Sequence, residues 1–135
     1  LEFTGEAKKE LDVLSRAINE VLELSIDAFV NNDLEAAAKV EALEQVVDGL
    51  KEQLRTRHIL RLQQRECSID AGFAWSDLLT NLERTSDHCS NIALCIIDAR
   101  EHNMNHHASG KKLKKDKEHF VQQYYEYAEK YSFKD

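Results

Sequence analysis

The sequence contains no proline and only four glycines among its 135 residues. Sandwiches, barrels and dinucleotide-binding folds need many tight turns, and such turns are built mainly from Gly, Pro, Asn and Asp. A chain with so few turn residues has room for only a few reversals of direction. The composition therefore predicts an all-α protein made of a small number of long helices.

Long apolar runs and a secretory signal peptide are also missing. No stretch approaches the roughly 18 consecutive apolar residues that a membrane-spanning helix needs. The 25 acidic residues outnumber the 18 basic ones, which gives a formal net charge of −7. Because a general nucleic-acid binder shows a basic face, we expect no nucleic-acid partner. The chain begins at Leu1 rather than at Met, and we expect it to be a piece of a longer protein.

Apolar residues recur at steps of three and four along the chain, which is typical of helices with one buried face. We expect long helices at about residues 5–30, 34–65 and 69–101, followed by a short helix at 118–133. Between the first two lie Asn31 and Asn32, and Asn tolerates the left-handed conformation of a helix end; Asp33 suits the cap of the next helix. Ser68 can cap the third helix in the same way.

These segments predict an antiparallel three-helix bundle with an additional short C-terminal helix. The expected organisation is a bundle over residues 5–101, a polar and basic linker over 102–117 and an amphipathic helix over 118–133. In the third helix, the expected buried stripe follows heptad spacing and includes Trp75, Cys89 and Ile92. Apolar residues off that stripe would need the C-terminal helix or a second copy of the chain, in a homodimer, to cover them.

Helices two and three each carry an acidic residue followed four positions later by Asp. The pairs are Glu44 with Asp48 and Glu83 with Asp87. Residues at i and i+4 share one helix face, so each pair aims two carboxylates at one point. In an antiparallel hairpin, the midpoints of the two pairs lie equally far from the break near Glu66. We therefore expect all four carboxylates to lie at nearly the same height.

Four carboxylates at one height repel one another unless something compensates their charge. A cation, bound protons or neighbouring Arg and Lys side chains would each do so. Oxygen-rich clusters suit hard cations such as Mg, Ca, Mn or iron. The alternative is an ordinary solvated helix face, because isolated acidic pairs of this spacing are common on helix surfaces.

The residues around both motifs resemble the PhoU family. The string LERTSDHCSNIA at 82–93 is similar to the third-helix signature of that family, and EALEQVVD at 41–48 is similar to its second-helix motif. The chain departs from the family at Thr85-Ser86, where an apolar residue and Gly are common. The resemblance covers about residues 10–101, which is one three-helix PhoU unit.

The resemblance implies a metal centre, since E(D)xxxD motifs of this family bind multinuclear metal clusters. The expected cofactor is a divalent or trivalent metal ion: Fe, Zn, Mg, Mn or Ca. Carried over by position, the expected metal ligands are Glu44, Asp48, Glu83, Asp87 and Asn91.

PhoU-like units also occur at the cytoplasmic end of bacterial sodium/phosphate cotransporters of the type II-related family. The resemblance therefore implies a non-catalytic regulatory domain of a sodium-dependent phosphate transporter, on the cytoplasmic side of the membrane. Its expected partners are the membrane domain of the parent transporter or phosphate-signalling proteins. The alternative is a metal-dependent enzyme or metal store, but the Glu-x-x-His pairs of redox di-iron bundles are missing.

Two basic stretches have two interpretations each. The late second helix would either form salt bridges to the acidic first helix or offer a docking surface to an acidic partner or membrane. This stretch comprises Lys51, Arg55, Arg57, Arg61 and Arg65. The lysine-rich segment 111–117 is either solvated or in contact with an anionic membrane surface.

Overall fold

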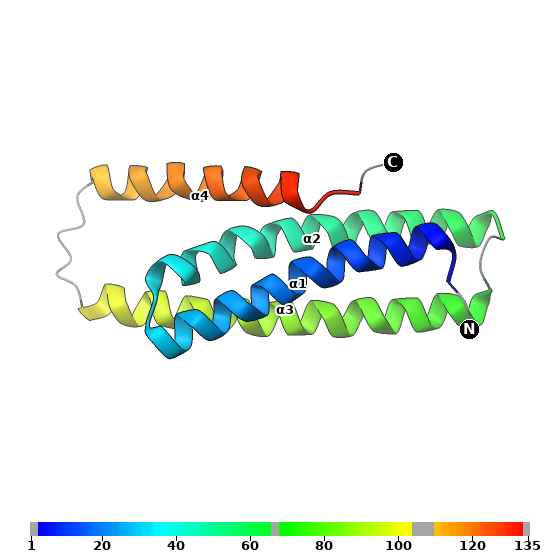
Figure 1. Ribbon diagram of the computed structural model, residues 1–135, viewed down its shortest axis with the longest axis horizontal. Coiled ribbons are helices and arrows are strands. Elements are labelled where there is room, and N and C mark those ends of the chain that lie inside the picture. Colours follow the sequence, from blue (N-terminus) through cyan, green and yellow to red (C-terminus); the bar gives the residue numbers. More distant parts are fainter. Residues whose placement is uncertain (1–2, 66–67, 104–109, 134–135) are drawn as a thin grey trace.

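The computed structural model describes residues 3–65, 68–103 and 110–133, and this part of the chain forms four α-helices and no strand. The helices are α1 (Gly5–Asn31), α2 (Leu34–Gln63), α3 (Ile69–Asn103) and α4 (Gly110–Lys130). α2 and α3 form a long antiparallel hairpin, α1 packs across both, and α4 lies beside α2 (Figure 1). The predicted all-α bundle with an additional C-terminal helix is confirmed.

The predicted signals at the helix ends are also confirmed. Asn32 has a left-handed backbone, with φ 50°, at the end of α1. The side chain of Asp33 accepts hydrogen bonds from two backbone amides in the first turn of α2. The hydroxyl of Ser68 accepts one from the backbone N–H of Ala71 at 3.1 Å. Local capping chemistry thus sets where α1 ends and where α2 and α3 begin.

The buried stripe of α3 follows the heptad prediction only in part, since Leu79 and Ser86, each one position past the expected stripe, are buried. Trp75 and Cys89 are buried as expected, but Ile92 is 42% exposed and Ala93 is fully buried in its place. An α-helix has 3.6 residues per turn, so a 3.5-residue pattern drifts around a long straight helix. Over five turns from Trp75 the drift amounts to about half a residue, which is enough to move the buried position from 92 to 93.

α4 is longer than predicted, because it begins at Gly110 rather than near residue 118. Lysines are good helix formers and the segment holds no proline, so the helix extends into the second half of the expected linker. Residues 104–109 lie outside the described residues, as do the side chains of 110–116. The contact of 111–117 with a membrane and the division into bundle, linker and helix remain predictions.

α4 is held at its C-terminal end by a polar contact with α1. Glu20 on α1 accepts hydrogen bonds from the Lys130 ammonium, at 2.7 Å, and from the Tyr131 hydroxyl. These hydrogen bonds hold the pKa of Glu20 below its usual value, although partial burial opposes them. The C-terminal end of α4 is therefore tied to α1 as well as packed along α2.

A buried ion pair joins α1 to the late part of α2. Arg61 donates to both carboxylate oxygens of Glu10, the shorter distance being 2.9 Å, and both side chains are almost fully buried. Arg57 pairs with the same carboxylate at 3.3 Å. This arrangement favours the first interpretation of the basic stretch, in which its arginines form salt bridges to the acidic first helix.

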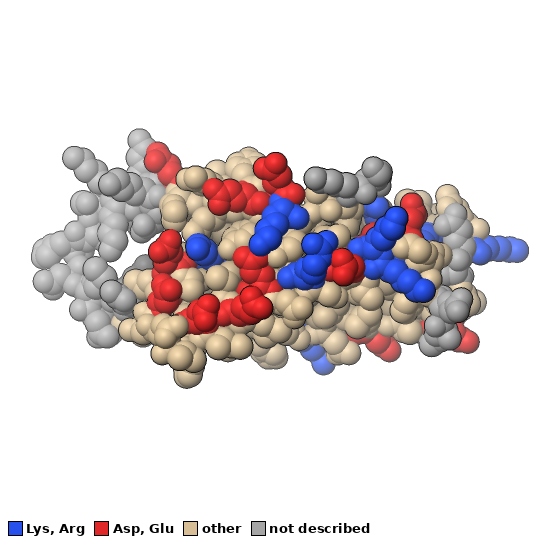
Figure 2. All heavy atoms as spheres, in the orientation of Figure 1, with Lys and Arg blue, Asp and Glu red and all other residues tan. Residues whose placement is uncertain are grey.

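Charge is unevenly spread over the face formed by α1 and α4. Figure 2 shows acidic side chains gathered over the half where α1 ends and basic side chains over the middle and the opposite half. An open cavity of about 510 Å³ on this side is lined by Glu20, Glu23 and Asp27, with Arg16 and Lys130 beside them. None of the described helices is both long and apolar enough to span a membrane.

Candidate metal centre

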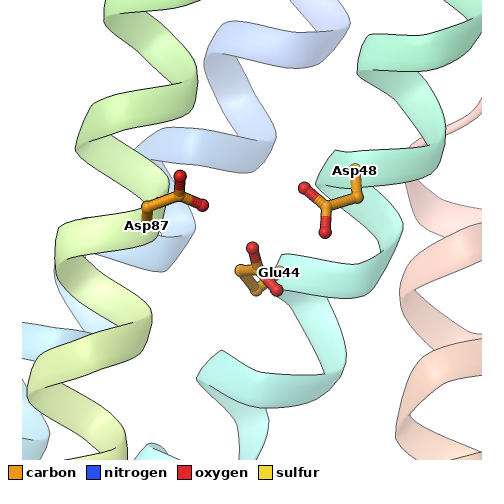
Figure 3. Close-up of side chains that lie close together, drawn as sticks. All are labelled: Glu44, Asp48 and Asp87. Carbon is orange, nitrogen blue, oxygen red and sulfur yellow. The ribbon is translucent and has the colours of Figure 1, made fainter.

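Three carboxylates from α2 and α3 meet on the face of the hairpin that is turned away from α1 (Figure 3). Glu44, Asp48 and Asp87 each offer one oxygen, and these oxygens lie within 4.8 Å of one another. Glu44 and Asp48 are one turn apart on α2, and Asp87 faces them from α3. The side chains on α2 are half-buried and that of Asp87 is exposed, so the group is open to solvent. We call these three residues the carboxylate triad.

The register of the α2–α3 hairpin agrees with the register expected from the two motifs. On one side of the triad, the Ser90 hydroxyl donates to Glu41 at 3.0 Å. On the other side, Lys51 pairs with Glu83 at 2.6 Å. Residues nearly equidistant from the turn thus contact each other across the two helices, as the positions of the motifs predicted.

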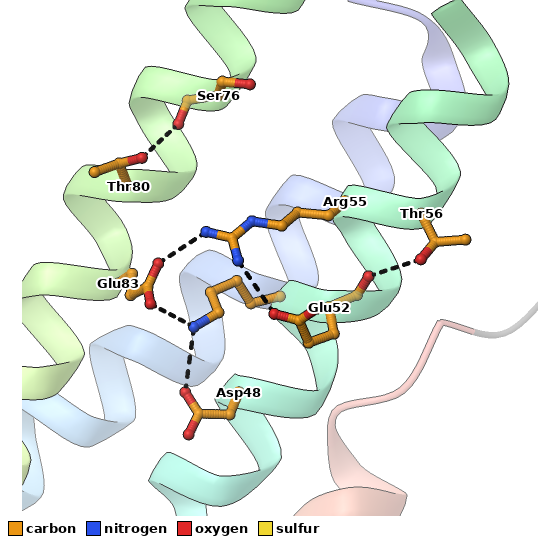
Figure 4. Close-up of polar contacts among 8 residues, drawn as sticks. Asp48, Glu52, Arg55, Thr56, Ser76, Thr80 and Glu83 are labelled. Carbon is orange, nitrogen blue, oxygen red and sulfur yellow. Dashed lines mark hydrogen bonds and ion pairs between the residues drawn. The ribbon is translucent and has the colours of Figure 1, made fainter. Parts of the chain in front are cut away.

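Glu83 does not join the triad, because two basic side chains hold it (Figure 4). The Lys51 ammonium donates to one carboxylate oxygen of Glu83 at 2.6 Å, and Arg55 donates to the other at 3.0 Å. The hydrogen bond from Lys51 is the main reason why the pKa of Glu83 lies below its usual value. The expectation that all four carboxylates converge therefore holds for three of them.

Asn91, the fifth residue expected at the site, is exposed and follows Asp87 by one helical turn on α3. The triad consists of carboxylates alone. Asn91 therefore stays a predicted ligand, next along α3 from Asp87.

The triad carries negative charge that its neighbours do not fully compensate. Burial and the nearby charges of Asp48, Asp87 and Glu41 raise the pKa of Glu44 from 4.5 to about 7. Burial also raises the pKa of Glu41. The Lys51 ammonium approaches Asp48 at 3.6 Å and reaches the triad from one side only. The negative charge of Glu83 is thus compensated by basic side chains, and that of Glu44 is compensated in part by a bound proton.

The donor set fits a single hard cation. Oxygens bound to one ion at about 2.1–2.5 Å lie roughly 3–5 Å apart, and the three oxygens of the triad fall within this range. Within the described residues the group includes neither thiol nor imidazole, and oxygen-only sites suit Mg²⁺, Mn²⁺ or Ca²⁺. Glu44, Asp48 and Asp87 are the residues that would hold the ion, and the exposed side leaves room for water ligands.

Two residues of this site were not expected from the motifs. Lys51 follows Asp48 by three positions and Arg55 follows Lys51 by four, so all three lie on one face of α2. That spacing indicates that Lys51 and Arg55 lie beside Asp48, but we expected the whole basic stretch to act as one surface. The structure separates the stretch into residues that pair with Glu83 on α3 and residues that pair with Glu10 on α1.

Comparison with known proteins agrees with this arrangement of motifs and helices. Residues 11–96 match the family model described as the PhoU domain. The chain belongs to the PhoU family. The matched residues include both carboxylate motifs and most of the α1–α3 bundle. No solved structure matches the chain.

Two relatives of this PhoU-family chain are longer proteins. An uncharacterized protein of Deinococcus radiodurans is 34% identical over 86 residues, which cover 63% of this chain and 31% of that protein. The phosphate-specific transport system accessory protein PhoU homolog 1 of Thermotoga maritima is 24% identical over 92 residues, covering 68% of this chain and 40% of that protein. The chain thus spans less than half the length of either relative.

Proposed function

We propose that this PhoU-family chain is a non-catalytic regulatory unit of a phosphate-uptake system and that the carboxylate triad is its cation-binding site. The observation that carries the proposal is the convergence of Glu44, Asp48 and Asp87 within the residues that match the family. A relative from Thermotoga maritima that is named as an accessory protein of phosphate-specific transport supports the link to phosphate.

Within this proposal, the parent protein is a sodium-dependent phosphate transporter, and the chain lies on the cytoplasmic side of the membrane. The support is that one three-helix unit of the family forms a complete bundle here, with an additional helix packed on it. The expected partners are the membrane domain of that transporter or phosphate-signalling proteins. Domains with their own hydrophobic core are commonly joined to larger proteins.

The position of the triad suggests how a cation would alter the bundle. Glu44 and Asp48 belong to α2 and Asp87 belongs to α3, so their mutual repulsion acts directly between the two helices. Compensation of that charge favours close packing of α2 on α3, and loss of the compensation favours their separation. A two-state equilibrium of this kind responds to a ligand in proportion to the difference in its affinity for the two states.

The second candidate function, a carboxylate-bundle enzyme or metal store, has no specific observation in its favour. The triad consists of carboxylates alone, whereas redox di-iron bundles combine carboxylates with imidazole ligands.

The metal site is tested by the metal content of protein purified without chelator. The wild-type chain is compared with Asp87→Asn and with Glu23→Gln, which removes an exposed acidic residue on α1 far from the triad. We expect about one divalent ion per chain in the wild type and in the Glu23→Gln control, and a loss of most of it in Asp87→Asn. Equal metal content in all three proteins would sink the assignment of the site.

The regulatory role is tested by phosphate uptake in cells that carry the full-length parent protein. Asp87→Asn is compared with Asp98→Asn, which removes an exposed carboxylate farther along α3. We expect the response of uptake to external phosphate to change with Asp87→Asn and not with Asp98→Asn. Unchanged uptake in both variants would contradict the regulatory role even if the site binds metal.

A further inference from the structure

Lys51 lies between the carboxylates of the two helices, although it belongs to neither motif. Its ammonium is 2.6 Å from an oxygen of Glu83 and 3.6 Å from an oxygen of Asp48 (Figure 4). Its side chain is only 10% exposed, so the positive charge is held in place rather than free in solvent. Lys51 thus links one acidic residue of each motif.

Without Lys51, these two carboxylates would face each other with no cation between them. Asp48 comes from α2 and Glu83 from α3, and both already contact a single positive group at the midpoint of the hairpin. A pair of carboxylates on facing helices is the kind of oxygen-rich position that a second hard cation would occupy. In this chain the ammonium of Lys51 fills that position.

Arg55 reinforces the effect of Lys51 on Glu83. It donates to the second carboxylate oxygen at 3.0 Å, so each oxygen of Glu83 accepts a hydrogen bond from a basic side chain. The Arg55 side chain is 44% exposed and can turn to solvent when a metal ion binds, whereas the Lys51 side chain, 10% exposed, is held beside Glu83. Lys51 is therefore the charge that a metal ion at Glu83 would meet. Like charges at such short distances repel strongly in a partly buried site.

We propose that Lys51 takes the place of a second metal ion and restricts the centre to one divalent cation, bound by the triad. The inference rests on the proposed cation site and adds its stoichiometry. A centre with one ion differs from the multinuclear clusters that the family resemblance implied. Of the second motif, only Asp87 would bind the ion, because Glu83 is paired with Lys51 and Arg55.

The test is the number of Mn²⁺ ions bound per 135-residue chain, measured by titration calorimetry and by metal analysis after equilibrium dialysis. Lys51→Met removes the charge, Lys51→Gln removes it but keeps a hydrogen-bond donor, and Lys51→Arg keeps the charge. Lys9→Met, which changes an exposed lysine of α1, is the matched control. Circular dichroism checks that each variant is folded.

We expect one Mn²⁺ in the wild type, in Lys51→Arg and in Lys9→Met, and two in Lys51→Met and Lys51→Gln. The inference is overturned if the wild type binds two ions, or if removal of the Lys51 charge in a folded variant leaves the number at one. If neither the wild type nor the folded variants bind Mn²⁺, the proposed cation site itself fails. Failure of the cation site is thus distinguished from the case in which Mn²⁺ binds but the number of ions does not depend on Lys51.

Discussion

At the scale of single residues, Glu44 is a carboxylate whose charge responds to pH near neutrality. Its pKa in the folded chain is raised to about 7 by burial and by the neighbouring carboxylates, against a usual value of 4.5. Between these two values the folded protein holds a proton that the unfolded chain releases. The stabilisation linked to this proton is fully present below about pH 4.5 and is lost as the pH rises through about 7.

Replacement of Glu44 by Gln is therefore expected to remove this pH dependence. In the presence of a chelator, Glu44→Gln should exceed the wild type in free energy of unfolding at pH 8 by about 1 kcal/mol, after allowance for solvent screening of a half-buried site. At pH 5 the two proteins should differ little. Urea unfolding followed by circular dichroism at both pH values measures the difference. The same difference at pH 5 and pH 8 would contradict the role given to Glu44.

Glu10 differs from Glu44, because its carboxylate is buried next to Arg61, which compensates its negative charge. Replacement of Glu10 by Gln leaves the buried arginine without its negative partner and is expected to lower the free energy of unfolding by about 3 kcal/mol. Asp12→Asn, which breaks the exposed pair with Arg16, is the control and should have little effect. If urea unfolding shows equal small losses for both variants, the buried pair is not a main contact between α1 and α2.

At the scale of helices, α2 contains one position that is not optimised for stability. Gly49 is exposed in the interior of the helix, and a side chain there would meet nothing within 4 Å. Gly49→Ala is expected to raise the free energy of unfolding by about 1 kcal/mol, because alanine loses less backbone entropy in a helix. At Gly72, by contrast, a Cβ would lie 3.1 Å from Leu62, so Gly72→Ala should gain less.

Thermal unfolding of the two glycine variants checks this order. A midpoint that rises for Gly49→Ala by several degrees, and by less for Gly72→Ala, agrees with the packing around these residues. A lower midpoint for Gly49→Ala would show that α2 is bent or packed at that position in a way that the structure does not contain.

The helices could be predicted from the sequence because their signals are local. The near-absence of turn residues, the caps at Asp33 and Ser68 and the apolar spacing together specify three long helices. The buried stripe of α3 could be predicted only in part, because a pattern of 3.5 residues departs from the 3.6 residues per turn of a straight helix. The start of α4 was missed because a lysine-rich segment has no apolar pattern but still favours a helix.

The site could be predicted to the level of motifs and register, but not to the level of individual contacts. The spacing of the motifs predicted correctly that carboxylates of α2 and α3 meet. It could not predict that Glu83 turns towards Lys51 and Arg55, because long side chains choose their partners by local geometry in three dimensions. Glu44, the first residue of the other motif, forms no ion pair with a basic side chain among the described residues and joins the triad.

At the scale of the whole molecule, the charges are arranged along the α2–α3 hairpin. Near the turn, the arginines of α2 neutralise Glu10 of α1, and in the middle Lys51 and Arg55 neutralise Glu83 of α3. Beyond them lies the triad, whose charge is compensated only in part. The incompletely compensated acidic charge of the α2–α3 hairpin thus lies at an open position between two helices, and we propose that a cation binds there.

The most direct measurement of this claim is anomalous diffraction from crystals of the chain grown with Mn²⁺. We expect one anomalous peak, within coordination distance of the carboxylate oxygens of Glu44, Asp48 and Asp87, with the Lys51 ammonium still beside Glu83. A well-ordered α2–α3 hairpin with no peak between these carboxylates, or with its only peak elsewhere, would contradict it.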